Sequence, residues 1–336
     1  MPVSIAPSLP HRTGRLRLVA QWIVAAVVIG FAARAVAKQW HDVAPALAEL
    51  RFDWLRVLGS GALVLATYLI LIEAWRATLR VWSQSLPFGS AARIWFVSNL
   101  GKYVPGKVWQ IAAMGALAQQ RGVSPAAAIG SSLLVNLVSV LAGFAVIATT
   151  AAGKVGAVIG AQTTGRGERS AELMIVGVAI VGGLALLLAP VTIPRLAVLA
   201  SRATGRQLVI PRVPASAVWV AAASTVASWL LYGIAFALFA HGVTPRATGN
   251  ASAYIAVYTG SYLAGYLALF APGGVGVREA VLVLAMPRFD LASAPDAAVI
   301  AITSRLWLTV LEILPGLLLF RGGRAQEARG QRADEG

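Results

Sequence analysis

One polar stretch interrupts this otherwise apolar chain: Ser98-Asn99-Leu100-Gly101-Lys102-Tyr103-Val104-Pro105-Gly106-Lys107-Val108-Trp109-Gln110. A helix does not run smoothly through Pro-Gly, because proline lacks a backbone N–H and glycine loses much conformational entropy in a helix. In hydrocarbon, such a break is tolerated only where protein or a water-filled cavity covers the freed backbone groups. We therefore interpret residues 98–110 as the tip of a polar, half-buried hairpin that the rest of the chain houses.

The composition is that of a membrane protein. Of 336 residues, 58% are hydrophobic and 12% are charged, with a mean hydropathy of +0.75. A soluble domain carries about twice that charged fraction. Several apolar runs reach the roughly 20 residues that a helix needs to cross a bilayer. The sequence predicts an all-α fold, a polytopic bundle of membrane helices.

The formal net charge of +15 fits membrane topology better than nucleic-acid binding. Arginines crowd the cytoplasmic loops of membrane proteins, where they also meet anionic lipids, so no nucleic-acid partner is expected. The absence of cysteine excludes disulfides, a thiolate nucleophile and a cysteine metal site. The three histidines, His11, His41 and His241, lie far apart, so we expect neither a metal site nor a cofactor.

Six apolar ranges are expected to form membrane helices: 18–37, 57–75, 126–150, 172–191, 215–240 and 297–320. Two further segments, 90–120 and 251–287, are apolar but interrupted by Pro-Gly. We expect an interfacial helix over residues 38–56 and a linker over 153–171. A cleaved signal peptide ending at Ala35-Val36-Ala37 is the less favoured alternative for the first helix, because Arg34 fits it poorly.

The expected organisation is a cytoplasmic N-terminal segment, one transmembrane domain and a disordered cytoplasmic tail. These cover residues 1–17, 18–320 (halves about 18–150 and 172–320) and 321–336. If each interrupted segment enters and leaves on one side, fifteen Lys and Arg residues share the face of the termini and eight lie opposite. This bias predicts both termini in the cytoplasm of a multi-pass bacterial inner-membrane protein. It does not distinguish re-entrant hairpins from pairs of full crossings.

The two interrupted segments echo each other. Tyr103-Val104-Pro105-Gly106-Lys107-Val108 is matched 167 residues later by Phe270-Ala271-Pro272-Gly273-Gly274-Val275. Each half then reads helix, helix, interrupted hairpin, helix, and an odd number of crossings predicts two inverted halves. Interrupted segments at corresponding positions of inverted halves point to the central site of a transporter. We expect Pro105-Gly106 and Pro272-Gly273 to approach each other near mid-membrane, each as the tip of a re-entrant hairpin.

Four cations accompany these breaks: Lys102, Lys107, Arg278 and Arg305. A charge at membrane depth is costly unless it is paired or faces water. Helices restarting at Gly106 and around Gly276 would add free N–H groups, which together with cations suit a phosphate or carboxylate. The alternatives are that each cation extends to the interface, or that the arginines form purely structural pairs with Glu279 and Glu312.

The predicted substrate-binding set combines these cations with neutral polar and turn residues. Its members are Asn99, Lys102, Tyr103, Pro105, Gly106, Lys107, Gln110, Pro272, Gly273, Gly274, Arg278 and Arg305. Glu279 and Glu312 carry coupling protons or balance the arginines, and no catalytic residue is expected. Interfacial belts explain the tryptophans near predicted helix ends, namely Trp22, Trp54, Trp75, Trp82, Trp95 and Trp219.

Three motifs carry a family resemblance: Asn99-Leu100-x-x-Tyr103-x-Pro105-Gly106-Lys107, Gly122-Val123-Ser124-Pro125, and Pro272-Gly273-Gly274-Val275-Gly276-Val277-Arg278-Glu279. Over roughly residues 50–320 the chain resembles the flippase-like family, which is the membrane region of lysylphosphatidylglycerol synthases (multiple peptide resistance factor) and its stand-alone relatives. The resemblance implies a lipid translocase that moves an anionic or lipid-linked headgroup. It also implies no synthase activity, because the soluble aminoacyl-transfer domain of the bifunctional relatives is not expected here.

The expected partners are membrane lipids with anionic headgroups, and the headgroup itself stays open among phospholipids, polyprenyl-phosphate sugars and hopanoids. A membrane glycosyltransferase using a polyprenyl-phosphate sugar is the alternative function, with Asp42, Glu49 and Asp53 as its candidate carboxylates. A lipid-binding subunit that transports nothing is a third. Gly177, Gly182 and Gly183 could mark the interface of a homodimer.

Overall fold

The computed structural model describes residues 51–103, 108–151, 214–268 and 271–334, with isolated positions between 177 and 199. The expected helix at 18–37, the linker at 153–171 and most of the expected helix at 172–191 lie outside these residues. So does the expected interfacial helix, apart from residues 51–53, which have no regular structure, and residues 54–56, which open a longer helix.

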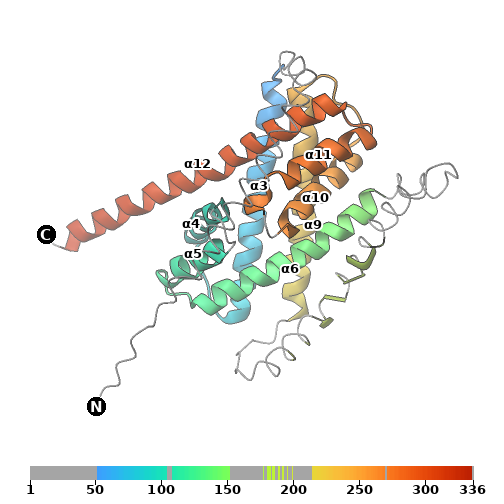
Figure 1. Ribbon diagram of the computed structural model, residues 1–336. Helices are drawn as coiled ribbons and strands as arrows, with labels where there is room; N and C mark the ends of the chain where they lie inside the picture. Colours follow the sequence, from blue (N-terminus) through green and yellow to red (C-terminus); the bar gives the residue numbers. More distant parts are fainter. Residues whose placement is uncertain are drawn as a thin grey trace, which may run out of the picture.

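Four long helices frame the described part of the chain (Figure 1): α3 (Trp54–Leu79), α6 (Pro125–Thr150), α9 (Ala215–Val243) and α12 (Ala294–Asp334). Each contains a stretch long and apolar enough to cross a membrane. They correspond to the expected helices at 57–75, 126–150, 215–240 and 297–320. Every regular element among the described residues is helical, which confirms the prediction of an all-α, multi-pass membrane protein.

Helix α12 overturns the expectation that the tail after Arg321 is disordered. The helix runs for 41 residues to Asp334, about 60 Å at the α-helical rise, which is roughly twice the hydrocarbon thickness of a bilayer. Figure 1 shows it extending well beyond the bundle. The tail lengthens a helix that is already nucleated in the apolar span, so each added residue gains a hydrogen bond without a new nucleation cost.

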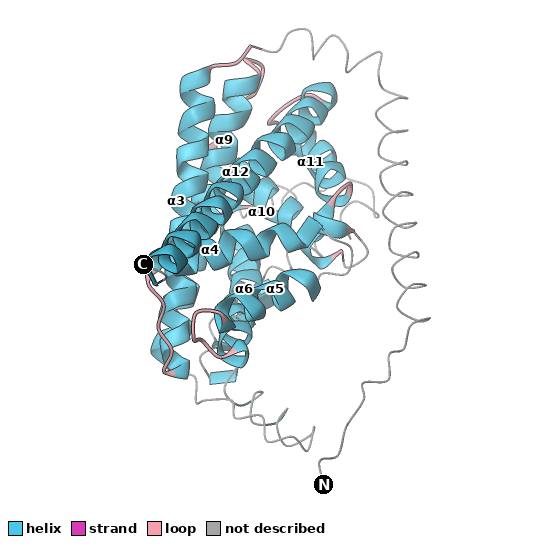
Figure 2. Cartoon of the chain, turned by 90° about the vertical axis from the view of Figure 1, so that its left-hand side faces the viewer, coloured by secondary structure: helices cyan, strands magenta, loops and turns pink. Residues whose placement is uncertain are grey.

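Both Pro-Gly segments are broken helices. The first comprises α4 (Phe88–Asn99), the 3₁₀ turn η2 (Leu100–Tyr103) and α5 (Val108–Gln119). The second comprises α10 (Ala251–Leu267), η3 (Pro272–Gly274) and α11 (Val277–Arg288). Helix α10 packs against α9 and α11, and Figure 2 shows α11 on the far side of α12 from α3. Helices α4, α5 and α11 have 12 residues each, about 18 Å, which is less than the roughly 30 Å of hydrocarbon in a bilayer.

Hydrogen bonds between helix ends bring the ends of four helices together on one side of the bundle. The N–H of Asp53 donates to Gly242 O at 2.8 Å, so α3 begins where α9 ends. At the same end, the hydroxyl of Ser252 donates to Thr150 O at 2.7 Å, which joins the start of α10 to the end of α6. The bond between Asp53 and Gly242 shows that α3 runs antiparallel to α9, its most extensive packing partner.

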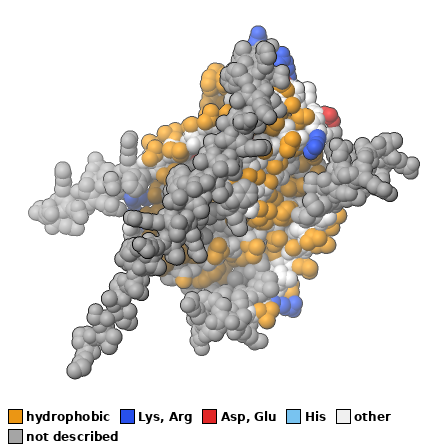
Figure 3. Space-filling view, viewed as in Figure 1, with side chains coloured by type: hydrophobic (Ala, Val, Ile, Leu, Met, Phe, Trp, Pro, Cys, Tyr) orange, Lys and Arg blue, Asp and Glu red, His pale blue; other side chains and the backbone are white. Residues whose placement is uncertain are grey.

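Many large apolar side chains lie on the surface of the described bundle. In the view of Figure 3, orange apolar side chains occupy the middle, while blue cationic side chains are seen above and below them. Long apolar side chains stay exposed in the absence of lipid, including Leu58, Leu69, Leu133, Leu137, Leu284, Leu306, Val310, Leu314 and Leu318. An exposed apolar surface of this extent is what a bilayer covers.

Candidate functional site

A cavity of about 370 Å³ lies where the long helices meet the two broken hairpins, α4–η2–α5 and α10–η3–α11. Its lining comes from α3, α4, α5, α6, α9, α10, η3, α11 and α12. Turn η2, which directly precedes the first Pro-Gly, packs against η3, which contains the second. Pro105 and Gly106 themselves lie outside the described residues. The volume falls in the range of about 300–1,000 Å³ that small-molecule sites occupy.

The second break is a glycine turn pressed against α10. Gly274 has a φ of +69°, and a Cβ built on it would lie 2.9 Å from Gly265 Cα. Both the backbone angle and the close approach require glycine. The sequence Pro272-Gly273-Gly274 therefore places η3 against the wall of the cavity.

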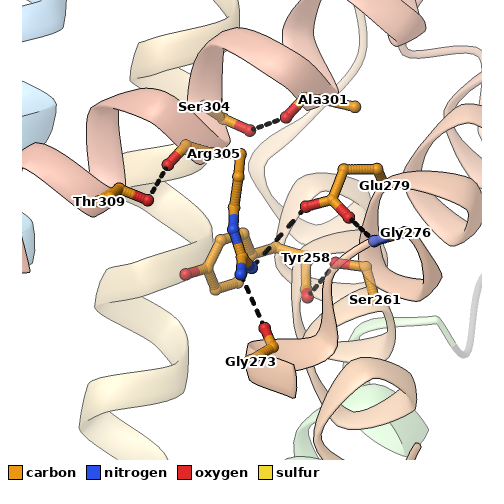
Figure 4. A network of polar contacts seen from close by, with 9 residues as sticks. All are labelled: Tyr258, Ser261, Gly273, Gly276, Glu279, Ala301, Ser304, Arg305 and Thr309. Atoms are coloured by element: carbon orange, nitrogen blue, oxygen red, sulfur yellow. Dashed lines mark hydrogen bonds and ion pairs between the residues drawn. The ribbon is translucent and has the colours of Figure 1, made fainter. Parts of the chain in front are cut away.

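Arg305 and Glu279 hold this turn in place (Figure 4). Arg305 Nη2 donates to Gly273 O at 2.8 Å, and Arg305 Nη1 lies 3.7 Å from Glu279 Oε1. Glu279 Oε2 accepts a hydrogen bond from the N–H of Gly276 at 2.7 Å. The N–H of Gly276 is therefore not one of the free N–H groups expected around this residue, because the side chain of Glu279 accepts its hydrogen bond. Arg305 is paired and Glu279 balances its charge, as the structural alternative proposed.

Arg278 is placed differently, although it lines the same cavity. The residue is 6% exposed. Its guanidinium carbon lies 4.8 Å from the ring centroid of Tyr258 and 5.3 Å from that of Tyr262. Its Nη2 is buried without a hydrogen-bond partner among the described residues. The two aromatic faces offset part of the cost of burying the cation, and its Nη2 keeps one donor unused among the described residues.

Two polar pairs complete the lining. Gln110 Nε2 donates to Asn99 Oδ1 at 2.5 Å, which ties α5 to α4 across the first break. The hydroxyl of Tyr68 donates to Glu312 Oε1 at 3.1 Å, which ties α3 to α12. All four residues line the cavity. The first pair adds amide groups to the site and the second adds a carboxylate.

The cavity brings together half of the predicted substrate-binding set. The cavity is lined by Asn99, Gln110, Gly273, Gly274, Arg278 and Arg305, and also by Glu312. Glu279 does not line it but pairs with Arg305, which does. The side chains of Lys102, Tyr103 and Pro272 are not described, and Pro105, Gly106 and Lys107 lie outside the described residues. Substrate binding by any of these residues stays a prediction.

The aromatic wall of the cavity was not predicted from the sequence. Tyr232 stacks on Tyr258 with ring centroids 5.8 Å apart, and Trp229 meets Tyr262 edge-on at 5.3 Å. A sequence signal existed, because Tyr254, Tyr258, Tyr262 and Tyr266 recur every four residues. That spacing places them on one face of α10.

Two tryptophans assigned to the interfacial belt are internal instead. Trp75 is 0% exposed, and Trp95 lines the cavity with a buried Nε1 that has no partner among the described residues. Trp54 and Trp219 are exposed, as a belt requires. Trp95 lies within α4, a helix too short to reach both interfaces, so its distance from a helix end does not indicate its depth.

The family follows from the sequence match. Residues 18–316 match the family described as the lysylphosphatidylglycerol synthase TM region. The chain belongs to this family. The lysylphosphatidylglycerol synthase TM region thus includes both broken hairpins and every described residue that lines the cavity. The resemblance seen over residues 50–320 is confirmed, and the match begins earlier, at residue 18. No curated protein matches the chain.

Proposed function

We propose that this member of the lysylphosphatidylglycerol synthase TM region family moves a lipid with an anionic headgroup between the leaflets of a membrane. Arg278 carries the proposal, because it is a buried cation with an unused donor in a cavity between two broken helices. The rings of Tyr258 and Tyr262 offset only part of the cost of burying this cation, and an anionic ligand would offset more of it.

The size of the cavity fits a headgroup whose acyl chains stay outside. A volume of about 370 Å³ holds a headgroup, and the exposed apolar faces around it offer the acyl chains a hydrocarbon path. Broken helices at corresponding positions of two halves suit alternating access around a fixed site. In this proposal the two hairpins are re-entrant and the halves are inverted, since 12-residue helices are short for a full crossing.

Transport by reconstituted protein tests the proposal. Proteoliposomes with fluorescent phosphatidylglycerol are treated with a membrane-impermeant quencher, and the rate at which inner-leaflet lipid becomes accessible is measured. Arg278→Gln is expected to slow transport at least about tenfold, equivalent to about 1.4 kcal/mol, and Arg278→Lys is expected to fall between it and the parent. Arg80→Gln is the control, because Arg80 is exposed at the end of α3 and does not line the cavity. Parental rates in the folded Arg278→Gln protein would contradict the proposal.

The described carboxylates do not favour the glycosyltransferase alternative. Asp53 caps α3 by accepting hydrogen bonds from the N–H groups of Leu55 and Arg56. The other two candidate carboxylates of a glycosyltransferase, Asp42 and Glu49, lie outside the described residues. Among the residues that the structure describes, no group of three His, Cys, Asp or Glu side chains is placed to hold a metal ion. Asp53 therefore has a structural role that accounts for its position.

A further inference from the structure

The main cavity lies off-centre along the bundle, nearer to one end of α3 than to the other. Its lining residues on α3 are Tyr68 and Leu71. Tyr68 follows Asp53 by fifteen residues, about 22 Å of helix, whereas Leu71 precedes Leu79 by eight residues, about 12 Å. The lining also includes Leu133, which is 52% exposed in the first half of α6, so the cavity borders the surface there.

A second, much smaller cavity lies on the Asp53 side of the main one. Its volume is about 10 Å³, close to the smallest space that holds one water molecule. On α3 it is lined by Ser60 and Val64, which are closer to Asp53 than Tyr68 is. Trp307 Nε1 donates to Ser60 Oγ at 3.3 Å, which joins α12 to α3 at this small cavity.

Three side chains line both cavities and therefore form the wall between them. They are Tyr232 of α9, Tyr258 of α10 and Leu308 of α12. The rings of the two tyrosines are stacked, with centroids 5.8 Å apart and 23° between the ring planes. Tyr258 and Leu308 are only 2% and 9% exposed. Because each residue comes from a different helix, a shift of one helix against the others would open this wall.

Apolar side chains also close the region between the small cavity and the Asp53 end of α3. Phe239, which lines the small cavity, stacks on Trp307 with ring centroids 6.5 Å apart. It belongs to a cluster of buried residues, namely Val57, Phe239, Val243, Ala298 and Val299. A polar headgroup that crossed towards this end would have to part the wall first and then this cluster, since neither offers it hydrogen bonds.

We propose that Tyr232, Tyr258 and Leu308 are the closed gate of the main cavity, and that the headgroup passes this gate on its way towards the Asp53 end of α3. The gate rests on the proposed transport of an anionic lipid, and it makes this structure the state that is closed towards that end. The guanidinium carbon of Arg278 lies 4.8 Å from the ring centroid of Tyr258, so the anion site and the gate share a contact. A ligand that draws Arg278 away from this ring removes a contact that stabilises the closed gate.

Thiol accessibility in the purified full-length protein tests the gate without transport. Because the chain contains no cysteine, Ser60→Cys reports the small cavity alone and Ser132→Cys reports the main cavity. The measurement is the rate of reaction with the neutral reagent 2-hydroxyethyl methanethiosulfonate in detergent. Ser132→Cys is expected to react at least tenfold faster than Ser60→Cys. Leu308→Ala, which removes part of the gate, is expected to speed the reaction of Ser60→Cys at least tenfold and to leave that of Ser132→Cys within twofold. The smaller truncation Leu308→Val should give an intermediate rate.

Leu134→Ala is the matched control, since Leu134 is 6% exposed and lines neither cavity. If Ser60→Cys reacts as fast as Ser132→Cys in the parent background, the gate is not closed. If neither change at Leu308 speeds Ser60→Cys, or if Leu134→Ala speeds it equally, the gate assignment is wrong. These outcomes do not depend on transport. A confirmed gate in a protein that fails to move phosphatidylglycerol would refute only the proposed function, whereas transport without this pattern of accessibility would refute only the gate.

Discussion

At the residue scale, Gly274 sets how closely the second break approaches α10. Its φ of +69° lies in the left-handed region, and Gly265 leaves no room for a side chain. Gly59 is the opposite case, a helical glycine on α3 with nothing within 4 Å of where its Cβ would lie. The same substitution at the two sites therefore separates a tertiary requirement from a purely local one.

Gly274→Ala is expected to destabilise the protein by about 2–4 kcal/mol, because left-handed strain and a close contact with Gly265 both oppose the methyl group. Gly59→Ala is expected to leave stability unchanged or to raise it by up to about 1 kcal/mol, since alanine favours a helix. Thermal unfolding in detergent, followed by circular dichroism, measures both. Equal unfolding temperatures for Gly274→Ala and the parent would show that the turn tolerates a side chain.

At the scale of elements, an ion pair fastens the second hairpin to α12. Arg305 on α12 contacts Glu279 on α11 and the carbonyl of Gly273 in η3, so one side chain joins three elements. Both charged side chains are about one-fifth exposed, at 19% and 20%. The pair is therefore only partly screened, and losing either partner leaves a largely buried charge.

A double-mutant cycle tests this fastening. Arg305→Gln and Glu279→Gln are each expected to destabilise the protein by about 1–3 kcal/mol, and the amide oxygen introduced by Glu279→Gln can still accept the N–H of Gly276. The double variant is expected to lose less than the sum, with a coupling of about 0.5–3 kcal/mol. Unfolding by denaturant in detergent gives the energies. Arg56→Gln, which opens an exposed pair with Asp53, is the control and should change stability by less than about 1 kcal/mol. Strictly additive losses would mean that Arg305 and Glu279 act independently.

At the scale of the whole molecule, the loops at the two ends of α3 should lie on opposite sides of the membrane. Residues 51–53 lie at one end of α3, beside the end of α9, and residues 83–87 follow its other end. The distribution of arginines predicts that residues 83–87 face the cytoplasm. Because the chain contains no cysteine, a single introduced thiol reports one position without background.

Phe52→Cys and Ser85→Cys are expected to react with an impermeant maleimide from opposite sides. Both positions are exposed and lie outside the helices. In spheroplasts, Phe52→Cys should react at once and Ser85→Cys only after the membrane is permeabilised. Permeabilised samples, in which both should react fully, control for access to the thiol. The reverse pattern would place the termini outside the cytoplasm, and reaction of both in spheroplasts would contradict a crossing by α3.

The sequence by itself determined the four membrane helices that the structure describes and the two breaks. Apolar runs of sufficient length must form helices in hydrocarbon, and Pro-Gly must interrupt them, because both rules concern only the local backbone. The helical conformation of the tail after Arg321 was not predicted, because its helix continues the apolar span before it. Of the six predicted binding residues that line the cavity, all except Arg305 lie close to a break in the sequence.

Only the tertiary structure decided how the charged and aromatic residues divide their roles. Arg278 and Arg305 look equivalent in the sequence, yet one lies over Tyr258 and the other pairs with Glu279. The depth of Trp95 and the aromatic wall of the cavity were also not predicted from the sequence. Each depends on contacts between helices far apart in the chain, and local patterns of polarity do not encode which partner a buried side chain will meet.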